Sequence, residues 1–161
     1  MALAAVTAWG NPAVGQTGGP SRALAVPRPL AANGARDLTF GTVFPGTPLA
    51  VSRRDPAHAG LFEIQGSHNQ EIRMDLLLPE ALRSPDGKVL ALSFQLGDAS
   101  IARSRGAADD LVFDPRTPLV TRLSADGGLI VRLGGTVMPG PRQVSDSYAA
   151  TVVITVFSLG T

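Results

Sequence analysis

The chain has 161 residues, of which 44% are hydrophobic and 17% are charged, and its formal net charge is +1. This length accommodates one domain with or without an extension, and the near-neutral charge excludes the electrostatic footprint of a nucleic-acid-binding protein or a polybasic membrane patch. Cysteine is absent, which excludes disulfides and thiolate metal sites, and no apolar run reaches the ~20 residues that a membrane helix needs.

The first residues, MALAAVTAWGNPAVGQ, are similar to the end of a secretory signal. Residues 2–9 are small or apolar, and Ala13-Val14-Gly15 offers small side chains at a cleavage point before Gln16. A positively charged n-region is missing, so two interpretations stay open for residues 1–22: a signal remnant, or an N-terminal arm. Gly, Pro and polar residues in 10–22 are typical of a flexible linker.

Alternation of apolar and polar residues dominates the chain from residue 23 onward. In 23–32, Pro27 and Pro29 lie two apart, so their missing N–H groups fall on one side, which predicts an edge strand. Further strands are predicted, in chain order, over 37–46, 47–55, 60–66, 70–79, 88–97, 109–114, 119–124, 124–135 and 148–159. Only 79–83 and 98–108 are compatible with helix. Roughly seven to nine short strands between turns predict an all-β antiparallel sandwich.

The last predicted strand, Tyr148 to Leu159, is the most strand-prone segment of the chain. One face carries Tyr148, Ala150, Val152, Ile154 and Val156, and the other carries Ala149, Thr151, Val153, Thr155 and Phe157. A strand buried on one side only would be more polar on its outer face, and no charged residue protects this segment from edge-to-edge pairing. We therefore expect this strand to need a partner along its free edge.

Four segments, DLTFGTVFPG, GLFEIQG, LGGTVMPG and SYAATVVITVF, occur in an order that resembles pilin-like domains of bacterial surface proteins. The relatives are spore-coat-protein-U-like domains and archaic chaperone–usher pilins, and the resemblance spans about residues 23–159. It implies an immunoglobulin-like β-sandwich over 23–161 that lacks its last strand and has no enzymatic activity. Spore-coat-U relatives usually carry cysteines, and this chain has none.

The resemblance also implies how such a sandwich is completed. The N-terminal extension of a neighbouring subunit adds the missing strand, and head-to-tail repetition of that contact gives an open filament. The acceptor edge would be formed by Tyr148, Ala150, Val152, Ile154, Val156 and Phe157, and the donor candidates in the arm are Leu3, Ala5, Thr7 and Trp9. The implied partners are copies of the chain itself, with a periplasmic chaperone and usher during assembly, and the implied location is extracellular.

A different class of function stays open beside this one, namely a self-contained secreted sandwich that acts as an adhesin or binds carbohydrate. A hydrolase has no support, because no carboxylate pair or triad is visible. The two histidines, His58 and His68, fall in predicted loops without metal-ligand spacing. The acidic cluster Asp109, Asp110 and Asp114 offers carboxylates for calcium, but it alternates like a strand. Arg53, Arg54, Arg103 and Arg105 are interpreted as solvated charges, and no cofactor is expected.

Overall fold

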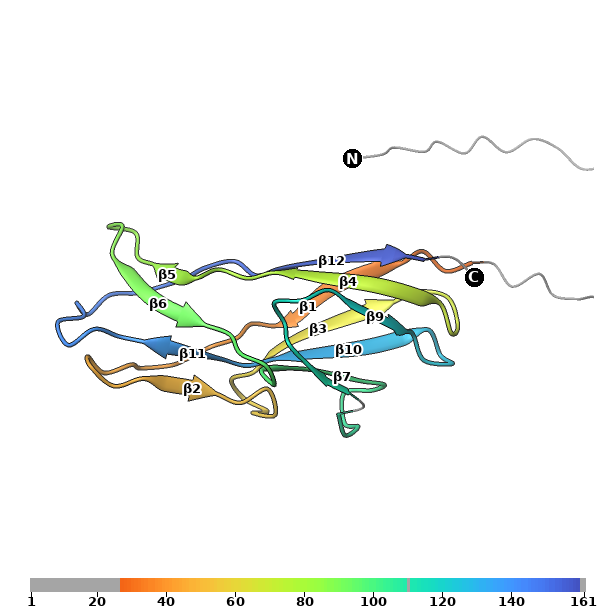
Figure 1. Ribbon diagram of the computed structural model, residues 1–161, viewed down its shortest axis with the longest axis horizontal. Coiled ribbons are helices and arrows are strands. Elements are labelled where there is room, and N and C mark those ends of the chain that lie inside the picture. The colour runs from red at the N-terminus through yellow and green to blue at the C-terminus, as the bar shows by residue number, and fades with distance from the viewer. Residues whose placement is uncertain (1–26, 110, 160–161) are drawn as a thin grey trace, which may run out of the picture.

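The computed structural model describes residues 27–109 and 111–159, which form twelve β-strands and no helix. All pairs of neighbouring strands are antiparallel. The strands are β1 (Ala31–Arg36), β2 (Leu49–Val51), β3 (Gly60–Gln65), β4 (Glu71–Leu77), β5 (Ala81–Arg83), β6 (Val89–Ser93), β7 (Ala99–Ala102), β8 (Leu111–Phe113), β9 (Leu119–Arg122), β10 (Gly128–Leu133), β11 (Gly135–Met138) and β12 (Val153–Ser158). The predicted all-β antiparallel sandwich is confirmed (Figure 1).

The strands make three sheets that share one interior. The orders are β1-β3-β10-β7-β8, β2-β11-β6-β5 and β12-β4-β9. Strands β4 and β5 follow each other along the chain, and Pro79, which has no N–H to donate, lies in the break between them. β12 pairs with β4, and the segment just before β12 forms one further antiparallel bridge with β5, between Ala149 and Arg83. Residues 71–83 therefore join the four-stranded and three-stranded sheets.

The core draws side chains from all three sheets. Its largest fully buried apolar members are Ile64, Ile72, Met74, Ile101, Leu123, Leu129, Val131, Leu133 and Val137. A smaller cluster of Leu61, Ala102 and Ile130 lies apart from this core, and Ala107 packs against it. The segment 103–109 thus covers the outer face of the five-stranded sheet, which explains why neighbouring residues of β10 are buried on both faces.

The chain passes from the five-stranded to the four-stranded sheet at the junction of β10 and β11. Gly134 lies at this junction and donates its N–H to the carbonyl of Asp98 at 2.7 Å. A Cβ at Gly134 would collide with the backbone of Val51, Ser52 and Arg53. Glycine is required here because two backbone segments approach more closely than a side chain allows.

Most predicted strands are present with shorter bounds. Those predicted over 47–55, 60–66, 70–79, 88–97, 109–114, 119–124 and 124–135 are confirmed as β2, β3, β4, β6, β8, β9 and β10. β1 is an edge strand as expected, but it occupies Ala31–Arg36 rather than 23–32, since Pro27 and Pro29 precede the hydrogen-bonded ladder. Residues 23–26 lie outside the described part of the chain.

Three other predictions are wrong in detail. Residues 37–46 are not a strand, because Gly41 and Gly46 adopt positive φ angles of 61° and 73° that turn the chain. The helix-compatible segments 79–83 and 98–108 instead contain β5 and β7, which pair with β6 and with β10 and β8. The last strand is regular only over Val153–Ser158.

The described residues include no helix long and apolar enough to span a bilayer.

We predict that Gly134→Ala lowers the free energy of unfolding by about 2 kcal/mol, since the added methyl group must displace backbone rather than a flexible side chain. Gly140→Ala is the matched control, because a Cβ at that position meets nothing within 4 Å. Urea unfolding monitored by circular dichroism measures both variants. Coincident midpoints would contradict the close approach of the chain at Gly134.

Candidate functional site

Strand β12 is an edge strand that pairs along only one side. Its six residues pair with β4, and the sheet order places nothing described beyond it. Strand β1, the edge of the five-stranded sheet, lies next to β12 without pairing to it (Figure 1). Each of these two strands has six residues, whereas the other sheet-edge strands have three or four. Proteins usually keep exposed edges short, so two long edges side by side single out this region, which we call the open edge.

Backbone groups of β12 point toward the open edge. The N–H of Leu159 donates to the carbonyl of Glu71 at 3.0 Å and so continues the ladder with β4. Hydrogen-bonded residues alternate along an antiparallel strand, so Phe157 also directs its backbone groups to β4. Those of Ile154 and Val156 therefore point the other way, and no strand among the described residues pairs with them.

The side chains of β12 are incompletely buried on both faces. Val152, Ile154 and Val156 pack against the core but remain only half-buried. On the opposite face, Val153 and Phe157 are 43% and 48% exposed. A strand inside a complete sheet would bury its inward side chains fully, as β4 does with Ile72 and Met74. The interior beside β12 therefore lacks cover on the side of the open edge.

The β1 side of the open edge carries small residues. Ala32 is partly buried against the core, and Gly34, two residues later, is on the same face and pairs with Phe62. A Cβ built on Gly34 meets no atom within 4 Å. Its φ is not positive, so the backbone does not require glycine there. Gly34 is exposed, so the absence of a side chain leaves open space at this position of β1.

The predicted acceptor residues divide between the two faces. Tyr148, Val152, Ile154 and Val156 are brought together on the core side, whereas Ala150 and Phe157 are exposed. The donor candidates Leu3, Ala5, Thr7 and Trp9 lie outside the described residues. The sequence did not single out Ala32 and Gly34 as residues of this site. The signal that could have found them is the run of small residues AANGA, which begins at the end of the predicted edge strand 23–32.

Tyr148 fixes the approach to β12. Its hydroxyl donates to the carbonyl of Val144 at 2.7 Å and accepts from Nε2 of Gln143 at 2.8 Å. These two hydrogen bonds tie the aromatic ring to the backbone of Val144 and the side chain of Gln143, four and five residues upstream. The contact holds the turn before the last strand, so the direction in which β12 enters its sheet is set locally.

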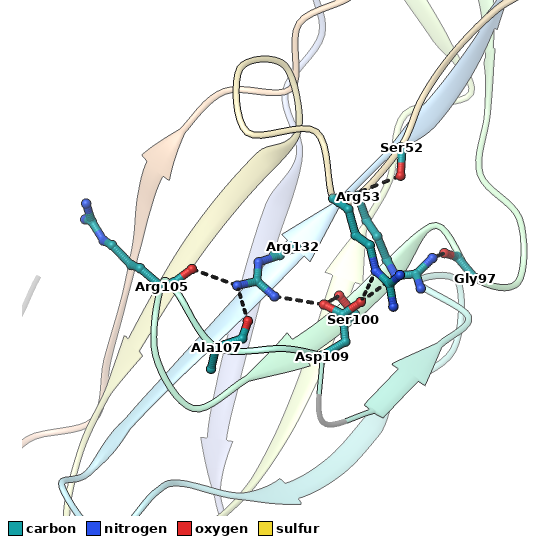
Figure 2. A network of polar contacts seen from close by, with 9 residues as sticks. Ser52, Arg53, Gly97, Ser100, Arg105, Ala107, Asp109 and Arg132 are labelled. Atoms are coloured by element: carbon teal, nitrogen blue, oxygen red, sulfur yellow. Dashed lines mark hydrogen bonds and ion pairs between the residues drawn. The ribbon is translucent and has the colours of Figure 1, made fainter.

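A second cluster of polar residues surrounds Asp109, whose side chain is only 3% exposed. Its Oδ2 accepts from Nε of Arg54 at 2.9 Å and Nε of Arg53 at 3.3 Å. Its Oδ1 accepts from Nη1 of Arg132 and from the hydroxyl of Ser100, both at 2.8 Å. Figure 2 shows these groups converging from the loop after β2, from β7 and from β10.

The same arginines also hold the surrounding backbone. Nη2 of Arg132 donates to the carbonyls of Arg105 at 2.8 Å and Ala107 at 2.9 Å, and Nη1 of Arg53 donates to the carbonyl of Gly97 at 2.6 Å (Figure 2). The segment 103–109 is therefore clamped to the sheet by ion pairs and backbone hydrogen bonds. The interpretation of Arg53 as a solvated charge is wrong, because its side chain is mostly buried on Asp109.

The electrostatics of this cluster favour an ionised carboxylate. Burial by itself raises the pKa of Asp109, but hydrogen bonds from Arg54, Ser100 and Arg132 and the charge of Arg53 outweigh it. Together they hold the pKa of Asp109 well below its ordinary value of 3.8. A shifted pKa can mark a reactive group. Both oxygens of this carboxylate already accept hydrogen bonds, so its role here is to pair with the arginine side chains.

The other chemistry-bearing residues are dispersed. His58 pairs with Asp55 at 3.1 Å, and Nδ1 of His68 contacts the carbonyl of Ala125. Asp114 bonds Arg116 on the surface, so it shares no partner with Asp109. Among the described residues, no group of three His, Cys, Asp or Glu side chains is placed to hold a metal ion.

No family model matches the chain, and no curated protein matches it. The functional proposals therefore rest on the geometry of the open edge, on the arginine cluster and on the patterns in the sequence.

We predict that Asp109→Asn lowers the free energy of unfolding by about 3 kcal/mol, because the mostly buried Arg53 and Arg132 lose their shared counter-charge. Asp114→Asn is the matched control and should leave stability near that of the wild type, since Arg116 is exposed. Urea unfolding at neutral pH compares the three proteins. Equal stability of the two variants would contradict the clamping role of Asp109.

The same variant has a distinct acid dependence. Because folding lowers the pKa of Asp109 below 3.8, its ion pairs stabilise the protein above that pH, and the stabilisation is lost as the pH falls from about 4 toward the folded-state pKa. The wild-type protein should therefore lose its advantage over Asp109→Asn between about pH 5 and the strongly acidic range. Urea unfolding of both proteins across this range measures the effect. A stability difference that is independent of pH would contradict the ion pairs as its source.

Proposed function

We propose that this protein is a structural subunit of an extracellular filament or surface layer, and that its copies join by strand addition at the open edge. The observation that supports this most directly is the combination of two long, unpaired, neighbouring edges with unfilled space at Gly34. An extended peptide laid along β12 would bond its free backbone groups and place alternate side chains toward the core. One added strand would therefore supply hydrogen-bond partners for the free backbone groups and also cover the half-buried side chains of β12.

The proposed added strand is the N-terminal arm of another copy, within residues 1–22. In this arm Leu3, Ala5, Thr7 and Trp9 alternate with small residues, so their side chains would share one face of an extended strand. A strand that matches β12 needs six residues, and 26 residues precede the described part of the chain. The arm is therefore long enough both to fill the open edge and to leave a connection.

The contacts of Arg28 favour an arm donated in trans. Its N–H donates to Oγ of Ser67 at 3.2 Å, and its Nη1 donates to the carbonyl of Asp126 at 3.3 Å. Pro27 and Pro29 on either side restrict the backbone further. To enter its own open edge, the arm would have to reverse direction immediately before this anchored and stiff segment. Insertion into a neighbour needs no such reversal.

A contact in which an arm of one copy enters the edge of the next is heterologous and leaves one arm and one edge free. Repetition of such a contact builds an open polymer rather than a closed ring, unless the rotation between copies closes. The resemblance to pilin-like domains adds the expectation of an immunoglobulin-like topology, of secretion, and of a chaperone and usher in assembly. We include these properties in the proposal, and we also propose that the protein has no enzymatic activity.

We predict that deletion of residues 1–22 abolishes polymers and leaves a folded monomer, because the described strands and core lie outside the deleted segment. Electron microscopy and size-exclusion chromatography compare the shortened and full-length proteins. A synthetic peptide of residues 1–22 should bind the shortened protein. Filaments formed without the arm would contradict the proposal. A full-length monomer whose own arm completes the sheet would favour a self-contained secreted adhesin or carbohydrate-binding sandwich.

We also predict that Gly34→Leu weakens binding of this peptide by about 1–3 kcal/mol, the usual cost of overpacking. The leucine would occupy the unfilled space that a donor side chain needs, and the protein should still fold because that space is open. Asn33→Leu is the matched control, since it adds the same side chain one residue away on the opposite face of β1. Isothermal titration calorimetry compares the two variants, and equal peptide affinity would argue against insertion beside β1.

A further inference from the structure

An open recess of about 610 Å³ lies over the outer face of the five-stranded sheet, beside the Asp109 cluster. Five arginines line it: Arg36 from β1, Arg53 and Arg54 from the loop after β2, Arg105 from the segment after β7, and Arg132 from β10. The recess is formed by elements far apart in the sequence. Only Arg36 comes from a strand of the open edge, and the other four arginines belong to elements outside it.

Positive charge in the recess exceeds the negative charge that the described residues supply. Three arginines share the single carboxylate of Asp109. Arg105 is paired with Glu63, and Asp55, which also lines the recess, is engaged by His58 and by backbone N–H groups. Five guanidinium groups thus face three carboxylates, an excess of two positive charges with the histidine neutral.

The arginines differ in how much of their hydrogen-bonding capacity is used. Arg132 and Arg53 spend their donors on Asp109 and on backbone carbonyls, as a structural clamp requires. Arg54 bonds Asp109 through Nε, and its side chain is 70% exposed. Neither Nη group of Arg54 has an acceptor among the described residues. A clamp explains Arg53 and Arg132 but leaves the outward donors of Arg54 without a role.

Asp109 cannot turn to meet these donors. Both of its oxygens already accept two hydrogen bonds each, and Ser100 beneath it is fully buried. The carboxylate therefore acts as an internal counter-ion that orders the guanidinium groups around it. Arginines held in this way are pre-organised, which lowers the cost of binding a further anion. Guanidinium forks suit planar or tetrahedral oxyanions in particular.

We propose that this recess is a binding site for a small oxyanion, held by the Nη groups of Arg54 with the surplus positive charge of the arginine cluster behind them. The lining contains no aromatic side chain among the described residues, so stacking on a sugar ring is not available. Recognition must then come from the charged group of the ligand. That group is either the carboxylate of an acidic sugar or a free inorganic oxyanion such as phosphate or sulfate.

The test is a titration of the full chain with sodium glucuronate, phosphate and sulfate at low ionic strength, followed by isothermal titration calorimetry, which reads binding to a monomer or a polymer alike. We expect saturable binding that is weakened by added sodium chloride, because the site is open to solvent. Arg54→Gln should reduce the affinity about tenfold, the usual effect of losing a charge-assisted hydrogen bond. The variant should fold, since Arg54 is exposed and Asp109 keeps two other cations.

Arg73→Gln is the matched control, because Arg73 is also a partly exposed arginine beside one carboxylate, Asp75, on a different sheet. Tighter binding of glucuronate than of phosphate and sulfate would identify an acidic sugar as the source, and the reverse order would identify the inorganic ion. Either result supports the site. The proposal is overturned if no anion binds saturably, or if Arg54→Gln and Arg73→Gln bind the anions equally well.

Discussion

The main constraint on this sandwich is that backbone N–H and C=O groups need hydrogen-bond partners, and some groups at its edge have none among the described residues. A β-strand satisfies half of its N–H and C=O groups on each side, and β12 uses only the side that faces β4. The same strand is incompletely covered on its inward face, where Ile154 and Val156 remain half-buried, as does Val152 just before it. One unfilled position thus leaves both polar and apolar groups in water. Because both kinds of deficit occur at one place, a single extended peptide would remove both.

The regular part of the fold was predictable because it follows local rules. Alternation in β4 and β6 reflects one more buried and one more exposed face, and glycines and prolines lie just beyond these strands. β7 could not be recognised in this way. Its four residues, Ala99–Ala102, are all buried, since segment 103–109 covers the face that would otherwise meet solvent. Cover from a distant segment removes the alternation from which a strand is predicted.

The candidate sites were less accessible from the sequence for a related reason. Asp109 lies 55 and 56 residues from Arg54 and Arg53, so no spacing along the chain indicates that they meet. The sequence therefore groups Asp109 with its neighbours Asp110 and Asp114, and predicts a solvated side chain for Arg53. At the open edge, the apolar pattern of β12 was visible, but the significance of Gly34 depends on the empty space beside it. Empty space results from how side chains pack, and no residue type in a sequence indicates where it will occur.

The anchoring of Arg28 has a mechanical consequence. Its contacts with Ser67 and Asp126 fasten the chain to the end of the sandwich, shortly before β1 begins. A load applied to the segment before Pro27 would meet these bonds first, and would then act on β1, which pairs with β3 along its length. Force along a ladder strains many of its hydrogen bonds together, whereas peeling breaks them one after another. The position of Arg28 thus suits the domain to bear tension through its N-terminal end.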